Sequence, residues 1–370
     1  MIVLTSNFLN HHMLPLCLEL DRLTGHQFRF VATATTPREQ RELCYKDNYE
    51  EYPFVVPAYR DRQTRAQARR LCRDCEVLIY GSTPYAFYAG RLLRRRFSFR
   101  YSESVLKTPT TPLNFPKRAL KYLLRDAFMQ FKEHYLLSAS AYAPESFARI
   151  GAFRGRCLRF GYFTPFAPRP VEPLLDGKRP GSILWAGRMI PLKKPLLAVE
   201  TAEKLRESGA AFHMDIVGAG ELFDAVCRAV ESRGLSDCVT VHRAMPNEEL
   251  RARMEESEIY LFTSNSEEGW GAVLNEAMSS ACGVIAYEKI GSVPYLLADG
   301  ENGLLFKKHD AEELAGLCRR LLEDGAFRRA LGRRAYETIA GEWNAAVAAE
   351  RLLRFVESGE TAEHGPLSRA

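Results

Sequence analysis

Two carboxylates, eight positions apart, lie around the start of a predicted helix. Glu268 belongs to the turn Glu268-Gly-Trp-Gly271, and Glu276 lies two helical turns into the run that follows. The short apolar run before the turn, residues 259–263, is typical of a buried strand. Free N–H groups at a helix start attract phosphate, and carboxylates accept hydrogen bonds from hydroxyls. The segment therefore favours a ligand with hydroxyls at both ends and anions between them.

A loop with two cations follows another strand-like run, which ends at Gly187. Arg188 offers a planar fork and Lys193 a point charge, and such a pair at the carboxyl end of a strand can hold a diphosphate. The alternative is that both are solvated loop charges. Further on, Gly218-Ala-Gly220 ends a third such run. Phe223 replaces the third glycine of a dinucleotide fingerprint, so the two glycines indicate close approach to a nucleotide rather than a dehydrogenase.

Short β-rich runs alternate with helical patterns along the chain, which predicts an α/β fold with two doubly wound, Rossmann-like parallel sheets. The predicted strands are 1–5, 28–33, 54–57, 77–81, 97–101, 135–139, 157–161, 182–187, 212–217, 239–242, 259–263, 283–286 and 303–306. A stretch rich in proline and glycine, 163–181, is the predicted linker. We predict domains over 1–175 and 176–345, followed by a C-terminal helix and disordered tail over 346–370.

Composition and charge narrow the class of protein. The chain has 370 residues, of which 46% are hydrophobic and 26% charged, as in soluble globular proteins. We expect no signal peptide and no membrane span, and an odd set of nine cysteines indicates a reducing cytoplasm. Residues 1–175 carry a net charge of +12 and the remainder −7. The basic half is therefore expected to face an anionic membrane, a phosphorylated acceptor or nucleic acid.

Taken together, these segments resemble the retaining GT-B-type glycosyltransferases of family 4, the group 1 glycosyltransferases. The resemblance rests on the loop from Arg188 to Lys193, on Gly218-Ala-Gly220, on Glu268 and Glu276 with seven residues between them, and on 291–294 and 299–305. It covers residues 182–325 well, whereas the first 175 residues match only in pattern. It implies a GT-B architecture, in which an N-terminal acceptor-binding domain and a C-terminal domain that binds a nucleotide-sugar donor face each other across a cleft.

The resemblance also implies a role for each residue of the donor site. Arg188 and Lys193 would hold the diphosphate, Glu268 the transferred sugar, and Glu276 the ribose hydroxyls. The backbone amides expected to support phosphates and sugar are those of Gly269, Trp270, Gly271 and the helix start at Ala272. Lys194 stands where the family commonly has glycine; we expect Lys193 to be the lysine that reaches the phosphate.

The resemblance implies transfer with retention of the anomeric configuration. Cations and the helix start would stabilise the leaving nucleoside diphosphate, and its phosphate would take the proton of the acceptor, so no strong base is needed. No Asp-x-Asp follows a strand, which favours a metal-independent site. We expect no cofactor, because the UDP- or GDP-linked sugar is a substrate.

Residues on the acceptor side are predicted from their places after strands. Asn10, His11 and His12 follow the first strand, where they could bind hydroxyls or phosphate, move a proton, or cap a helix. Glu103 follows the fifth strand and could order the acceptor hydroxyl or cap a helix. Acceptor and linkage depend on this half of the chain.

Basic residues concentrate in 91–100 and 116–132. The second segment has an apolar stripe with cations beside it, a pattern of helices that lie on anionic lipid and also of helices packed on their own sheet. We favour peripheral contact with the inner face of the plasma membrane and a lipid-linked or glycan acceptor in surface polysaccharide biosynthesis. The alternatives are a UDP-sugar 2-epimerase of the same architecture and a basic nucleic-acid-binding protein.

Overall fold

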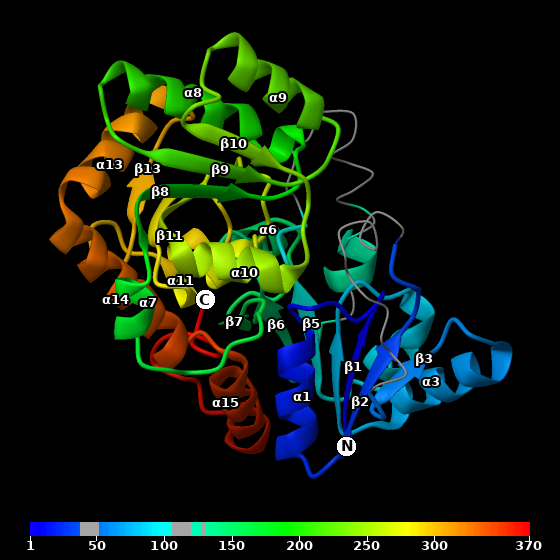
Figure 1. Cartoon of the computed structure of the whole chain (residues 1–370). Coiled ribbons are helices and arrows are strands. Elements are labelled where there is room, and N and C mark those ends of the chain that lie inside the picture. Colours follow the sequence, from blue (N-terminus) through cyan, green and yellow to red (C-terminus); the bar gives the residue numbers. More distant parts are fainter. Residues whose placement is uncertain (38–51, 106–119, 121, 128–129) are drawn as a thin grey trace. The chain divides into compact units, whose positions relative to one another are not determined.

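The computed structural model describes residues 1–37, 52–105, 120, 122–127 and 130–370. These residues form two compact units (Figure 1). Unit 1 comprises Met1–Pro165 and Trp343–Ala370, and unit 2 comprises Phe166–Glu342. The C-terminal segment thus returns to the first unit. Each unit is built on one parallel sheet, as the strand–helix alternation predicts.

The sheet of unit 1 has the order β3-β2-β1-β4-β5-β6-β7. Its strands are β1 (Ile2–Ser6), β2 (Phe28–Ala32), β3 (Val55–Pro57), β4 (Val77–Tyr80), β5 (Ser98–Ser102), β6 (His134–Ser138) and β7 (Cys157–Arg159). The strand order reverses between β1 and β4, so crossovers on the two sides run in opposite directions. Right-handed crossovers then put helices on both faces of the sheet. The carboxyl ends of β1 and β4 meet at this switch point, where ligands bind in doubly wound folds.

Helices cover both faces of this sheet. α1 (Leu14–Leu23) packs against α15 (Ala345–Ser358), and α3 (Arg62–Asp74) packs against the short helices η2 (Tyr85–Phe87) and α4 (Ala89–Leu92). The other helical segments in the described part of unit 1 are the π-helical turn η3 (Leu123–Ala127) and α6 (Ala143–Ala148). Figure 1 shows α15 beside α1, far from it in sequence.

Unit 2 repeats this plan with the order β10-β9-β8-β11-β12-β13. Its strands are β8 (Arg179–Ala186), β9 (His213–Val217), β10 (Val239–His242), β11 (Ser257–Phe262), β12 (Gly283–Tyr287) and β13 (Leu304–Phe306). Its helices are α7 (Glu172–Asp176), η4 (Pro191–Lys193), α8 (Pro195–Glu207), α9 (Phe223–Ser232), α10 (Asn247–Glu256), α11 (Val273–Ser279), α12 (Val293–Leu296), α13 (Ala311–Glu323) and α14 (Gly325–Gly341). Helix α8 packs against α9 and α13, and α11 packs against α10 and α14.

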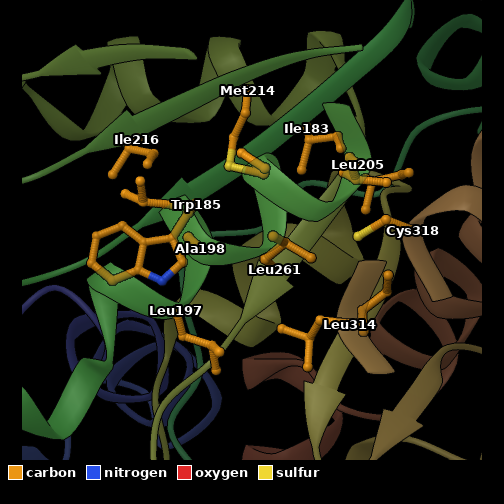
Figure 2. Close-up of a cluster of buried hydrophobic side chains, with 14 of the residues drawn as sticks. Ile183, Trp185, Leu197, Ala198, Leu205, Met214, Ile216, Leu261, Leu314 and Cys318 are labelled. Atoms are coloured by element: carbon orange, nitrogen blue, oxygen red, sulfur yellow. The ribbon is translucent and has the colours of Figure 1, made fainter. Parts of the chain in front are cut away.

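The core of unit 2 explains why its strands read as continuous apolar runs. Both faces of the sheet are covered, so every residue of β11 is buried. Figure 2 shows Ile183, Met214 and Leu261 of the sheet gathered with Leu205 and Leu314 of α8 and α13. The rigid sheet made by this packing fixes the carboxyl ends of β8 and β11, which lie at the switch point of unit 2.

Three predictions about organisation need correction. The units divide at 165/166 and 342/343, because α15 packs on α1 rather than on the second sheet. The last residues are not a disordered tail: Leu367 is fully buried, and the backbone N–H groups of Leu367 and Ala370 donate to the carbonyls of Arg159 and Cys157. The predicted linker contains α7 and the start of β8. Of the predicted helix 116–132, residues 116–119, 121, 128 and 129 lie outside the described residues.

Candidate functional site

The loops that carry the predicted donor residues start at the switch point of unit 2. The loop after β8 carries Arg188 and Lys193, and the loop after β11 carries Glu268. Trp185 Nε1 donates a 2.7 Å hydrogen bond to Thr263 Oγ1, which in turn donates to the backbone oxygen of Lys193 at 2.8 Å. This chain of hydrogen bonds fastens the loop after β8 to the end of β11, which brings Lys193 toward Glu268.

Lys193 and Glu268 form a close ion pair. Nζ of Lys193 lies 2.5 Å from Oε2 of Glu268, and both side chains are 13% exposed. The Lys193 ammonium also lies 5.9 Å from the centre of the Phe262 ring. In such a desolvated place a charge-assisted contact is stronger than at an open surface. The pair presents a cation and an acceptor of hydroxyl hydrogen bonds side by side.

Glu276 is buried deeper than Glu268, and only 5% of it is exposed. Burial raises the pKa of its carboxyl to about 7, although the nearby Arg251 lowers it in part. Arg251 donates to the backbone oxygen of Glu276 at 2.7 Å and to Ser279 Oγ at 2.8 Å. Hydrogen bonds donated by a ligand to such a buried carboxyl would favour its ionised form.

Two glycines of the Gly-Ala-Gly segment are required by the packing of neighbouring backbone. A Cβ at Gly218 would lie 2.0 Å from the oxygen of Gly187, and one at Gly220 would lie 2.6 Å from the oxygen of Met189. The backbone N–H of Met189 donates to the oxygen of Ala219 at 2.8 Å. The glycines thus hold the loop that carries Arg188 against the end of β9. Direct contact of these glycines with a nucleotide stays a prediction.

The turn between Glu268 and α11 also needs a glycine. Gly271 has φ +74°, and a Cβ there would lie 2.3 Å from Cζ of Phe262. The indole of Trp270 is fully buried and donates to Asn275 Oδ1 at 2.9 Å, so it anchors the turn from inside. Among the described residues, no acceptor takes the backbone N–H groups of Gly269, Gly271 or Ala272. These donors are available to a ligand at the start of α11.

Arg188 and Lys194 differ from Lys193 in their surroundings. Arg188 is exposed and forms no ion pair or side-chain hydrogen bond with any described residue, so its guanidinium is free to bind an anion. Lys194 caps α8 with φ 54° and ψ 49°, the left-handed conformation that glycine adopts most easily. The glycine common at this position in the family thus has a backbone reason. The geometry brings Lys193, and not Lys194, to Glu268.

Unit 1 has a cavity of about 620 Å³ at the carboxyl ends of β1, β4 and β5. Its walls include Asn10 and Glu103, two of the predicted acceptor-side residues. Oε1 of Glu103 accepts a 2.9 Å hydrogen bond from the hydroxyl of Tyr162. Tyr162 lies between the predicted strand 157–161 and the predicted linker, where no pattern in the sequence indicates this contact. The structure therefore brings two of the four predicted residues into one cavity.

His11 and His12 lie in the turn before α1 and are absent from the lining of this cavity. The ring of His12 packs at a tilt against the ring of Tyr162, with 4.5 Å between their centres, and meets the ring of His11 edge-on at 4.9 Å. Burial lowers the pKa of His11 to about 4 and also lowers the pKa of His12, which the neighbouring His11 lowers further. Both rings are therefore neutral at pH 7 and carry no charge to attract phosphate.

Two further features of the described residues bear on function. No group of three or more His, Cys, Asp or Glu side chains among them is arranged to hold a metal ion. Metal independence stays a prediction. No helix in the described part of the chain is long and apolar enough to cross a membrane.

Comparison with known proteins matches the site-bearing unit to a family. Residues 172–338 match the family model described as glycosyl transferases group 1. The amylovoran biosynthesis glycosyltransferase AmsK of Erwinia amylovora is 28% identical over 184 residues, 48% of this chain and 45% of that protein. D-inositol 3-phosphate glycosyltransferase of Arthrobacter sp. (strain FB24) is 30% identical over 178 residues, 47% of this chain and 42% of that protein. The matches thus span less than half of either relative.

The fold has relatives over its whole length. The crystal structure of Anabaena HepE in complex with UDP matches with a TM-score of 0.71 and 14% identity, covering 96% of this chain and 99% of that one. Two doubly wound parallel sheets, as predicted for a GT-B architecture, are thereby confirmed.

Proposed function

We propose, from the premise that residues 172–338 belong to the group 1 glycosyl transferases, that the chain transfers a sugar from a nucleoside-diphosphate sugar to a hydroxyl acceptor. The acceptor is a lipid-linked or glycan intermediate of surface polysaccharide biosynthesis, the process named for the Erwinia relative. The transfer retains the anomeric configuration and needs no metal. The observation that carries the proposal is the Lys193–Glu268 pair beside the buried Glu276.

Four charged groups suit different parts of such a donor. Arg188 and Lys193 bind the diphosphate, Arg188 through its free fork and Lys193 as a point charge. Glu268 accepts hydrogen bonds from hydroxyls of the transferred sugar. Glu276 accepts them from the ribose, which favours its ionised form and lowers its raised pKa on binding.

The donor-site residues stabilise the negative charge that develops when the bond between the sugar and the diphosphate breaks. The bond between the anomeric carbon and the phosphate oxygen breaks, and its electron pair stays on the leaving diphosphate. Arg188, Lys193 and the free N–H groups of Gly271 and Ala272 stabilise that added charge. The acceptor oxygen forms the new bond on the same face of the sugar, and its proton passes to the leaving phosphate. No residue of the chain needs to act as a strong base.

A thermal-shift panel tests this function. UDP, GDP, ADP and CMP are each added with and without EDTA. We expect one nucleoside diphosphate to raise the melting temperature, as ligands that bind only the folded state do, and EDTA to leave the shift unchanged. If no nucleoside diphosphate raises it, the proposed donor site is wrong. A 2-epimerase would also bind UDP, but it would convert the UDP-sugar to an isomer without an acceptor, which NMR detects.

Membrane contact is proposed through α3 and the exposed part of the predicted basic segment 91–100. In the segment 91–100, Arg91 and Arg100 are buried, and Arg91 donates to the carbonyls of Cys75 and Phe97. Arg94, Arg95 and Arg96 are exposed, and so are Arg62, Arg65, Arg69 and Arg70 of α3. Leu93, which is 68% exposed, precedes the first group in the chain. Arginines that follow an exposed leucine suit an anionic lipid surface.

Vesicle sedimentation checks this contact. The chain should pellet with vesicles that contain phosphatidylglycerol and not with neutral vesicles. Leu93→Asp should lower the bound fraction, whereas Leu18→Asp, at a leucine 44% exposed on α1, should not. Equal binding to both kinds of vesicle would remove this part of the proposal.

A further inference from the structure

Two arginines, which the donor chemistry does not use, line the cavity of unit 1. Arg100 comes from β5 and Arg125 from η3, and both converge on Asp126. Nε of Arg100 lies 3.6 Å from Oδ1 of Asp126, and Nη2 of Arg125 lies 3.1 Å from Oδ2. The Asp126 side chain is fully buried, while those of Arg100 and Arg125 are 6% and 20% exposed. One carboxylate thus compensates two largely desolvated cations.

Each guanidinium keeps donor groups without a hydrogen-bond acceptor among the described residues, including Nε of Arg100 and Nη2 of Arg125. Arg100 donates through Nη1 to the oxygen of Gly81 at 2.5 Å, and Arg125 donates through Nε to Asp126 at 3.1 Å. Nη2 of Arg100 and Nη1 of Arg125 donate to no acceptor within the described residues. Tyr80 and Tyr122 lie under the two guanidinium groups, at 5.3 and 4.9 Å from ring centre to Cζ, and hold them in place.

Among the described residues of the lining, the other charged group is Glu103, whose carboxylate accepts from the hydroxyl of Tyr162. The remaining polar residues of this described lining are neutral, with Ser82, Thr83 and Tyr101 among them. The cavity therefore offers forked cationic donors from Arg100 and Arg125 and a carboxylate acceptor from Glu103. Forked donors match a carboxylate or phosphate, and a carboxylate acceptor matches a hydroxyl.

We infer that this cavity binds an anionic sugar, with its carboxylate or phosphate on Arg100 and Arg125 and a hydroxyl on Glu103. An anion at this place supplies the second negative charge that two desolvated cations lack. We take this sugar to be the acceptor of the transfer reaction, and only that identification rests on the proposed function. The binding site itself stands on the geometry of unit 1.

Binding of three small probes tests the inference, with titration calorimetry at one fixed salt concentration. Methyl β-glucuronide carries a carboxylate, glucose 6-phosphate carries a phosphate, and methyl β-glucoside is neutral. At least one anionic probe should bind ten-fold or more tightly than the neutral one, and the stronger of the two identifies the anion. Equal affinity for charged and neutral probes, or no saturable binding of either anionic probe, would overturn the inference.

Variants locate the binding. Arg125→Gln should lower the affinity for the anionic probe about ten-fold or more, because a charge-assisted contact is lost. Arg125→Lys should recover part of the affinity, because it restores charge without the fork. The control is Arg154→Gln, at an exposed arginine of the same unit, and it should change nothing. Equal loss in the Arg125 and Arg154 variants would contradict the assignment, because a general change of net charge would then explain it.

UDP binding by the same samples separates this inference from the proposed function. Arg125→Gln should leave UDP affinity unchanged, because Arg125 belongs to unit 1 and the donor residues to unit 2. If an anionic probe binds and no nucleoside diphosphate does, the cavity assignment survives and the transfer reaction fails. If UDP binds but the probes show no preference for charge, the proposed donor site survives and the cavity assignment fails.

Discussion

The ammonium of Lys193 and the carboxylate of Glu268 compensate each other at 2.5 Å, although we assign them to different parts of the donor. The pair fixes both side chains before any ligand arrives, which lowers the ordering cost of binding. It also keeps a desolvated cation and a desolvated anion from standing alone. The Lys193–Glu268 pair therefore preorganises the donor site before a ligand binds.

A double-mutant cycle measures the coupling free energy between Lys193 and Glu268. Lys193→Met and Glu268→Gln should each destabilise the ligand-free protein, and the double variant should lose less than the sum of the two. The expected coupling is about 0.5–3 kcal/mol, the range for residues in direct contact. Urea unfolding of the four proteins gives this number. Strict additivity would mean that the contact contributes nothing to stability.

The two glutamates should respond differently to substitution. Glu276→Ala should weaken binding of the nucleoside diphosphate, because Glu276 is assigned to the ribose. Glu268→Ala should leave nucleotide affinity nearly unchanged and mainly lower turnover of the nucleotide-sugar. Calorimetry with the nucleotide and a steady-state assay of nucleotide release separate the two effects. Equal loss of nucleotide affinity in both variants would overturn the assignments.

The raised pKa of Glu276 makes stability depend on pH. The folded chain keeps a proton up to about pH 7 that the unfolded chain loses near 4.5, so the free energy of unfolding falls between these values as pH rises. The size of the effect is roughly 3 kcal/mol. Glu276→Gln should therefore be more stable than wild type at pH 8 and similar to it at pH 4. Urea unfolding at both pH values tests this, and a difference between the two proteins that does not change with pH would contradict it.

Lys194→Gly should stabilise the protein without loss of function. A residue other than glycine at φ 54° is strained by about 1–2 kcal/mol, and glycine relieves that strain at some cost in chain entropy. We expect a net gain of about 0.5–1 kcal/mol. Nucleotide affinity should stay unchanged in Lys194→Gly and fall in Lys193→Ala. The opposite pattern would mean that Lys194 binds the phosphate.

Gly218→Ala tests the packing under the cation loop. Its Cβ would meet the Gly187 oxygen at 2.0 Å, so the loop that carries Arg188 must move. We expect a loss of about 2–3 kcal/mol in the free energy of unfolding together with weaker nucleotide binding. Gly316→Ala, in the middle of α13 with no atom within 4 Å of the new Cβ, should instead stabilise by about 0.5–1 kcal/mol. Similar losses in both variants would mean that the close approach at Gly218 has no special effect.

Strand positions were predictable because the apolar runs are set by burial on both faces of a sheet. β10 occupies 239–242 as predicted, and β8 begins three residues before its predicted start, since Arg179 and Pro180 lack the apolar signal. The membership of α15 in unit 1 was not predictable, because its apolar face fits any complementary surface. The burial of Arg91 could not be predicted either, because one arginine within a basic run carries no sign of the carbonyls that accept its hydrogen bonds.

The loops that carry the proposed donor residues were easier to place from the sequence than the walls of the unit 1 cavity, for a physical reason. Lys193, Glu268 and Gly271 are tied to short loops at strand ends, where spacing along the chain sets position in space. Arg100 and Arg125 meet only through the folding of distant segments, so spacing gives no hint of their shared Asp126. The neutral state of His11 also depends on burial, which a pair of adjacent histidines does not indicate.

The most direct test of the donor site is calorimetric titration of UDP, GDP and ADP into wild type and Glu276→Ala in EDTA, with Gly316→Ala as the control. We predict that one nucleoside diphosphate binds wild type and the control with equal affinity, and binds Glu276→Ala at least ten-fold more weakly. Undiminished affinity in Glu276→Ala, or no binding of any of the three nucleotides to wild type, would contradict the account.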